Sequence, residues 1–154
     1  MKQRAFTLIE LLIAISIMAI LFTIGIAKYN DFNRRQILSQ ATLELKSNLR
    51  LIQDKALSGE KDSSCISALE GWYISFPTDH SYKIYGQCGD TEFPIPPTTI
   101  DLLKKHIKIG LSGTLKNYVK FKPLGHGSEE EVTITLEAFG TSSQIVVTKV
   151  GEIK

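Results

Sequence analysis

The chain has 154 residues, of which 22% are charged, and its formal net charge is +2. This length suggests one globular domain beyond any terminal segment, and the net charge is too small to argue for a polyanionic partner. The two cysteines, Cys65 and Cys88, fit one disulfide in an oxidising compartment, although two free buried thiols fit the same spacing.

The N-terminal part of the chain is a long apolar run. From Phe6 to Ala27 there are 22 residues with a single charge, Glu10. A helix of this length spans roughly 33 Å, enough for a hydrocarbon core of about 30 Å. A secretory signal peptide has a shorter apolar core and ends in a small-residue cleavage site, which is missing here. The run therefore predicts a membrane anchor over residues 6–28, and nearly balanced positive charges on its two sides leave its orientation open.

The next segment, residues 29–58, continues the helix with an amphipathic pattern. Apolar residues recur at spacings of three and four, which places them on one face of a helix. They are Leu38, Ala41, Leu45, Leu49, Ile52 and Ala56. This stripe predicts packing on a sheet, with packing on a partner helix as the alternative. No proline interrupts residues 6–58, and Gly59 is well placed for a left-handed cap, so we predict one helix of about 50 residues.

After Gly59 the period of the apolar residues changes to that of strands. "GWYISF" and "SYKIYG" flank "PTDH", which predicts a hairpin. "CGDTEFPIPPTTID" is predicted to be a loop, because proline cannot donate a hydrogen bond within a central strand.

Four further strands are predicted downstream. "HIKIGLSGTLKNYVKFKP" contains two of them around Gly110–Gly113, and "EEVTITLEA" and "QIVVTKV" alternate strongly and are rich in Val, Ile and Thr. Strands that follow a long helix predict an α+β domain over residues 59–154, with an antiparallel sheet covered by the helical stripe.

Sequence patterns of catalytic and metal sites are lacking. The three histidines, His80, His106 and His126, share no metal-ligand spacing. "GHGS" around His126 lacks the lysine and the following helix of a P-loop, and no Gly-x-Ser-x-Gly elbow is present. Cys65 is better explained by a disulfide with Cys88 than as a nucleophile. We therefore expect neither enzymatic activity nor a cofactor or metal.

The opening "MKQRA" followed by "FTLIELLIAISIMAIL" resembles the N-terminus of type IV prepilins and type II secretion pseudopilins. The shared pattern is a short basic leader, a small residue, Phe and then Thr-Leu-Ile-Glu-Leu-Leu. The resemblance implies a pilin-like fold and a leader, residues 1–5, that prepilin peptidase cuts between Ala5 and Phe6. Phe6 would then be N-methylated. The small residue before the cut is normally Gly, and Ala5 departs from that pattern.

The resemblance also implies a role for Glu10 in assembly. A carboxylate in hydrocarbon is unfavourable by several kcal/mol unless it has a partner. In the family, this acid pairs with the N-terminal amine that cleavage creates on a neighbouring subunit. Here that amine would belong to Phe6. The alternatives are a Glu10 that reaches the lipid headgroups or that favours the positive end of the helix.

Membership of this family would define both partners and location. The partners would be other pilin subunits, prepilin peptidase, the inner-membrane assembly platform and, before assembly, membrane lipid. The chain would cross the cytoplasmic membrane once with its C-terminal domain outside, and would then join a cell-surface or periplasmic filament.

Weaker similarities point to the minor pilins of the FimT and GspH types. "LSQATLELKSNLRLIQDKALSG" resembles their helix after the anchor, and the segment from "YVKFKPLGHG" to "GEIK" resembles their closing strands. Major pilins usually carry a proline some twenty residues into the mature chain, where this chain has Ala27. This difference favours a minor subunit or a pseudopilin.

Two other functions stay open at this point. Some FimT-type pilins bind DNA, and residues 101–122 contain six lysines, which are Lys104, Lys105, Lys108, Lys116, Lys120 and Lys122. The alternative is that these lysines only decorate a pair of solvent-exposed strands. The family's DNA-binding tail, Gly-Arg-x-Arg, is replaced here by Gly151-Glu152-Ile153-Lys154. The remaining alternative is a membrane-anchored adhesion or sensor domain outside any filament.

Overall fold

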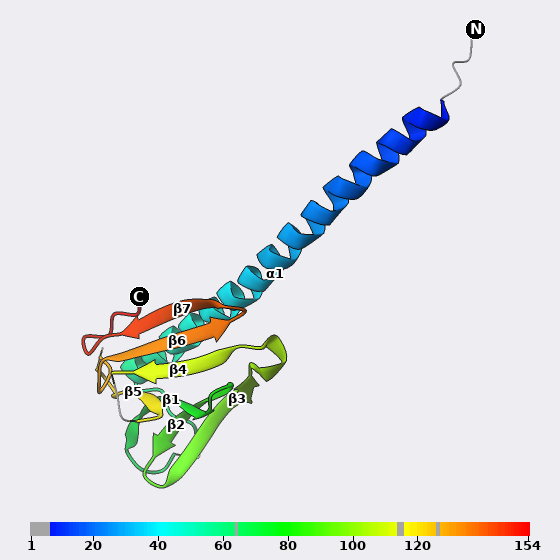
Figure 1. The fold of residues 1–154 in the computed structure, drawn as a ribbon. Helices are drawn as coiled ribbons and strands as arrows, with labels where there is room; N and C mark the ends of the chain where they lie inside the picture. The colour runs from blue at the N-terminus through cyan, green and yellow to red at the C-terminus, as the bar shows by residue number, and fades with distance from the viewer. Residues whose placement is uncertain (1–6, 64, 114–115, 126) are drawn as a thin grey trace. The chain divides into compact units, whose positions relative to one another are not determined.

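A computed structural model of the chain describes residues 7–63, 65–113, 116–125 and 127–154, although the side chains at positions 23–25 and 27 are not described. The predicted single long helix is confirmed: α1 (Leu8–Ser58) runs without interruption for 51 residues (Figure 1). The chain divides into two compact units, Met1–Gln36 and Ile37–Lys154, so that the first part of α1 belongs to one unit and the rest to the other.

The C-terminal end of α1 is closed by the glycine that was predicted to cap it. Gly59 has a φ of 66°, in the left-handed region. Its N–H donates to the carbonyl of Ala56 at 3.1 Å, and the N–H of Glu60 donates to the carbonyl of Lys55 at 3.0 Å. These two bonds form a Schellman motif, which satisfies carbonyls that the end of the helix would otherwise leave unpaired.

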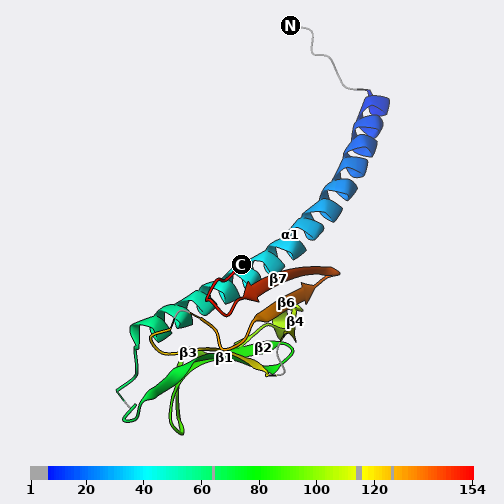
Figure 2. The same ribbon diagram turned by 90° about the vertical axis from the view of Figure 1, so that its left-hand side faces the viewer.

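The apolar stripe of α1 is the part of the helix that packs in the second unit. All six predicted stripe residues are at most 5% exposed, and Leu45, Leu49 and Ile52 are completely buried. They belong to one core cluster with residues from all the strands that follow, and α1 lies along those strands in Figure 2. The prediction that the stripe packs on β-structure is therefore confirmed.

The first sheet has four antiparallel strands in the order β3-β2-β1-β5. Its strands are β1 (Leu69–Thr78), β2 (Ser81–Cys88), β3 (Thr91–Asp101) and β5 (Tyr118–Phe121). β1 and β2 form the hairpin that the turn "PTDH" predicted. The sheet is built by local pairings on one side, β1 with β2 and β2 with β3, and by one long-range pairing of β1 with β5.

The predicted loop over "CGDTEFPIPPTTID" is wrong, because most of it forms β3. β3 lies at the edge of its sheet, where a residue without an N–H costs no ladder hydrogen bond. The pairing is also irregular: Lys83 pairs with Thr99 and Tyr85 with Pro94, so the segment with Pro96 and Pro97 bulges past the partner strand. The prolines therefore mark an edge strand and not a loop.

The second sheet has three antiparallel strands in the order β4-β6-β7. They are β4 (Lys108–Ser112), β6 (Val132–Ala138) and β7 (Thr141–Val147), and a short 3-10 helix, η1 (Leu103–Lys105), precedes β4. The predicted strands at these positions are confirmed, and so is the α+β class. However, the domain contains two antiparallel sheets, and β4 and β5, although neighbours along the chain, belong to different ones.

The last residues fold back on β7. Val147 forms a bridge with Ile153, and the N–H of Lys154 donates to the carbonyl of Val146 at 3.0 Å. The turn between them is held to the helix by Gln53, whose side-chain amide donates to the carbonyl of Gly151 at 2.7 Å. The segment "GEIK" is thus bridged to β7, and its Ile153 is buried in the core.

A tyrosine hydroxyl inside the core connects β2 to the helix. Tyr82 is fully buried, and its hydroxyl accepts a hydrogen bond from the side-chain amide of Asn48 at 2.9 Å. Burial raises the pKa of Tyr82 to about 12, because ionisation would create a charge in the core, and the bond from Asn48 opposes this only in part.

This tyrosine predicts a loss of stability in alkali. Between pH 10 and about 12 the unfolded chain releases the Tyr82 proton while the folded chain keeps it, so stability falls as pH rises, by at most roughly 3 kcal/mol. Tyr82→Phe should flatten this dependence, measured by chemical denaturation at several pH values. Tyr29→Phe is the matched control, since that side chain is 69% exposed. An unchanged slope in Tyr82→Phe would contradict the assignment.

Candidate functional site

The N-terminal end of α1 is organised around Glu10. Thr7 immediately precedes the helix, and both its backbone N–H and its hydroxyl donate to Oε2 of Glu10, at 2.9 and 2.7 Å. The N–H of Glu10 points back to the hydroxyl of Thr7 at 3.4 Å. This reciprocal arrangement is a capping box, which satisfies free N–H groups at the start of a helix. The predicted cleavage pair, Ala5 and Phe6, lies outside the described residues.

The capping box gives Glu10 a second role that the sequence interpretation missed. Its signal was present as Thr-x-x-Glu before an apolar run. Both bonds from Thr7 reach the same carboxylate oxygen, and Oε1 of Glu10 accepts no hydrogen bond from any described residue. One oxygen is therefore engaged within the helix while the other is available to a donor outside it.

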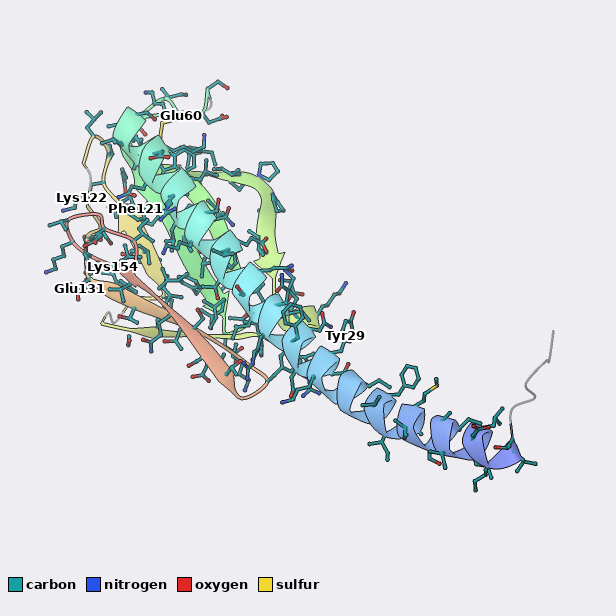
Figure 3. All side chains as sticks on the ribbon, turned by 90° about the horizontal axis from the view of Figure 1, so that it is seen from above. Tyr29, Glu60, Phe121, Lys122, Glu131 and Lys154 are labelled. Carbon is teal, nitrogen blue, oxygen red and sulfur yellow. A yellow bond between two sulfur atoms is a disulfide. The ribbon has the colours of Figure 1, made fainter. Side chains whose placement is uncertain are left out.

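The rest of α1 within the first unit presents an apolar surface. Every large apolar side chain described between residues 8 and 26 is at least 52% exposed. These are Leu8, Ile9, Leu11, Leu12, Ile13, Ile15, Ile17, Met18, Ile20, Leu21, Phe22 and Ile26. Tyr29, labelled in Figure 3, follows them and is 69% exposed. An apolar surface of this extent marks contact with lipid or with other protein chains.

Within the part of the chain that the structure describes, no helix combines the length and the hydropathy needed to cross a membrane.

The two cysteines are joined in the second unit. Cys65 and Cys88 form a disulfide with their Cα atoms 5.7 Å apart, which connects the segment after α1 to the end of β2. The predicted pairing is confirmed. Both residues are buried, at 5% and 3% exposure, so neither sulfur is presented as a nucleophile.

The six predicted DNA-binding lysines lie in two groups. Lys104 and Lys105 are on η1 and Lys108 begins β4, in the three-stranded sheet. Lys120 is on β5, in the four-stranded sheet, and Lys116 and Lys122 lie just outside that strand. The two groups therefore lie in or next to different sheets (Figure 1).

Two of the lysines near β5, Lys116 and Lys120, contact neighbouring side chains. Nζ of Lys116 lies 3.2 Å from Glu129, and this hydrogen bond is the main reason why the pKa of Lys116 is raised. Nζ of Lys120 lies 5.3 Å from the ring centroid of Tyr73, and a hydrogen bond with Tyr73 raises the pKa of Lys120. These contacts support the four-stranded sheet, and the one at Lys116 pairs the lysine with an opposite charge.

The histidines take structural positions. Nδ1 of His80 lies 2.7 Å from the carbonyl oxygen of Ile107, and His106 ends η1 with a φ of 55°. His126 lies outside the described residues. In the described ranges, no group of three His, Cys, Asp or Glu residues is arranged to hold a metal ion.

Comparison with family models decides what the N-terminal end of α1 is. Residues 1–26 match the model of the prokaryotic N-terminal methylation motif. The N-terminal segment of the chain therefore carries a type IV prepilin-like methylation motif. The match covers Ala5, Phe6 and Glu10, the residues to which the resemblance assigned roles, and supports processing of the prepilin-like chain by prepilin peptidase. Comparisons with curated proteins and with solved structures gave no match.

Proposed function

We propose that this chain is a structural subunit, a minor pilin or pseudopilin, of a type IV pilus or of a type II secretion-like filament. The observation that carries the proposal is the exposed apolar surface of α1, whose only charged residue between positions 7 and 27 is Glu10. The precursor would be anchored in the cytoplasmic membrane with its C-terminal domain outside, and an inner-membrane assembly platform would move it into a filament.

The two oxygens of the Glu10 carboxylate suggest how the subunit changes partners. In the precursor, Thr7 holds Oε2 and so lowers the free energy of the acid in an apolar environment. Cleavage after Ala5 would create a cationic amine on Phe6. In a filament core, that amine of one subunit would meet Glu10 of the next, and the attraction in low dielectric would set the axial register of otherwise apolar helices.

The second unit would form the part of the subunit outside that core. It has its own apolar core, its own disulfide and a capped helix end. A domain built in this way does not depend on the first unit for its apolar contacts, so the anchor can leave lipid without disturbing it.

The test is mass spectrometry of purified, sheared filaments. The proposal requires this chain among the filament proteins, with a mature N-terminus at a methylated Phe6. Detection of the chain only in the membrane fraction, in cells that make filaments, would favour the membrane-anchored adhesion or sensor domain instead.

The processing step gives a separate prediction. A bulky residue in Ala5→Leu should block the cut, because the peptidase accepts a small residue at this position in the family, whereas Ala5→Gly should preserve or speed it. The readout is the mass of the surface-exposed chain, which should lack five residues in the wild type. Intact residues 1–5 in the exported wild-type form would contradict the prediction.

A second candidate function is DNA contact through the lysines on and after η1. Lys104 and Lys108 are exposed, and no acidic side chain among the described residues forms an ion pair with either of them. Lys105 is less available, because its Nζ lies 3.3 Å from Glu44. The folded-back tail adds little, since Lys154 pairs with Glu152 at 3.0 Å.

Neutralising this group of lysines tests the DNA function. The triple variant Lys104→Gln, Lys105→Gln, Lys108→Gln should lower affinity for duplex DNA and flatten its salt dependence, because fewer counterions are released. Lys116→Gln is the control, since that lysine is already paired with Glu129. Absence of any DNA binding by the wild-type chain at low salt would remove this candidate.

A further inference from the structure

A hollow of about 330 Å³ separates the two sheets of the second unit. Its walls come from the end of β1 with the turn that follows, from β4 and from the residue before β5. The lining includes Phe76, Pro77, Asp79, Ile109, Leu111 and Asn117. Both long walls are strand edges, so backbone groups as well as side chains line the hollow.

The first of these edges is the outer side of β4. Among the strands that the structure describes, β4 has a neighbour, β6, on one side only. The N–H of Ile109 donates across the hollow to the carbonyl of Asp79 at 2.6 Å, so it points away from β6. In an antiparallel pair, residues alternate between facing the partner strand and facing away. The carbonyl of Ile109 and both backbone groups of Leu111 therefore face the hollow, where no described residue forms a backbone hydrogen bond with them.

The second edge is the end of β1. β5 pairs with β1 only from Trp72 to Ser75, and the N–H of Phe76 donates to the carbonyl of Asn117 at 2.8 Å. Beyond Phe76, β1 continues to Thr78 without a neighbouring strand on that side among the described residues.

The other outer strand edges of the domain are protected in ways that β4 is not. β3 carries the three prolines, which cannot donate to an added strand. β7 is covered by residues 152–154, and β5 by the bridge of Phe121 with Ser128 and the bond from the Glu129 N–H to the Lys120 carbonyl. β4 contains no proline, and a Cβ added at Gly110, at its centre, would meet only the carbonyl oxygen of Thr135, at 4.0 Å.

We propose that the outer edge of β4 binds an extended segment of another polypeptide by β-strand addition. Backbone groups presented at strand spacing are satisfied by a strand. Phe76, Pro77 and Leu111 supply apolar walls for its side chains. The carboxylate of Asp79, 61% exposed at the Ile109 end and 3.5 Å from Nε2 of His80, selects a basic residue. In the antiparallel orientation that residue is at the C-terminal end of the added segment. The proposal does not depend on assembly of the chain into a filament.

Peptide binding to the full chain in detergent tests the proposal. The probe is a fluorescein-labelled hexapeptide, Thr-Val-Thr-Val-Thr-Lys with blocked ends, followed by fluorescence anisotropy. Two further peptides carry N-methyl groups on alternate backbone nitrogens, each on one of the two alternating sets. The peptide methylated on the nitrogens that face β4 should bind roughly tenfold more weakly. The unmethylated peptide should also slow hydrogen exchange in residues 108–112. Equal binding of all three peptides, or no binding of any, would overturn the proposal.

Two variants with matched controls locate the contact. Leu111→Pro removes a donor that does not pair with β6, so it should weaken binding about tenfold while circular dichroism stays unchanged, whereas Leu111→Val should bind as the wild type does. Asp79→Asn should weaken binding of the lysine peptide about threefold at low salt. Unchanged binding by Leu111→Pro would overturn the proposal. Self-association of the chain without peptide, lost in Leu111→Pro, would assign the edge to a second copy and also overturn it.

Discussion

Glu10→Leu is expected to leave the chain membrane-anchored and processed but to reduce its entry into filaments strongly. The substitution removes the only charge from an apolar stretch, which favours anchoring. In the proposed filament it would also leave the Phe6 amine of a neighbouring subunit without its partner. Breaking one partner of a buried ion pair typically costs about 3–5 kcal/mol. The measurement is the amount of the variant in sheared filaments, relative to the processed chain in the membrane.

The capping box makes Glu10→Gln the decisive control. A glutamine at position 10, the third residue of the helix, can still accept a hydrogen bond from the Thr7 N–H. The variant therefore keeps the cap while it removes the charge. If the ion pair matters, Glu10→Gln should fail as Glu10→Leu does, and Glu10→Asp should be intermediate because its reach is shorter. Normal filament entry of Glu10→Gln with failure of Glu10→Leu would show that the cap, and not the ion pair, is the role of this residue.

Removing the disulfide with Cys65→Ala and Cys88→Ala together is expected to lower the free energy of unfolding by about 3 kcal/mol. The bridge joins residues 23 positions apart, and without it the unfolded chain regains the freedom of that loop. The loop contains the first hairpin, so the loss should concern the four-stranded sheet. Chemical denaturation of the wild type and of the double variant measures the difference.

Reduction of the wild-type chain provides the control for that comparison. A reducing agent should lower its stability by a similar amount and should leave the double variant unchanged. A peptide map without reduction should recover Cys65 and Cys88 in one linked fragment. Recovery of both thiols free from exported protein would contradict the bridge.

The helix of this protein follows from local sequence. Its length follows from the absence of proline, its end from Gly59, and its buried face from apolar residues at spacings of three and four. Strands β6 and β7 could also be predicted from local sequence, because alternation and β-branched residues are local properties. Each of these signals acts within a few residues, so no knowledge of the rest of the chain is needed to interpret it.

The strand with three prolines shows where local interpretation fails. Proline excludes a central strand, and only the position of β3 at the sheet edge, with a bulge beside Pro96 and Pro97, makes it compatible with pairing. Which strand lies at an edge depends on long-range pairing. The same holds for the separation of β4 from β5, since each pairs with a strand distant in sequence.

By itself the sequence determined the prepilin-like N-terminus, the acid within it, the long helix and its buried face, because these depend on residue type and short spacing. Only the tertiary structure decided that the lysines of residues 104–122 lie in or next to two different sheets, that two cysteines 23 positions apart are bonded, and that β4 pairs with a strand on one side only among the described residues. The physical reason is that pairing between distant segments is selected by burial and by the supply of backbone partners across the whole domain. A pattern in one short segment does not contain that information.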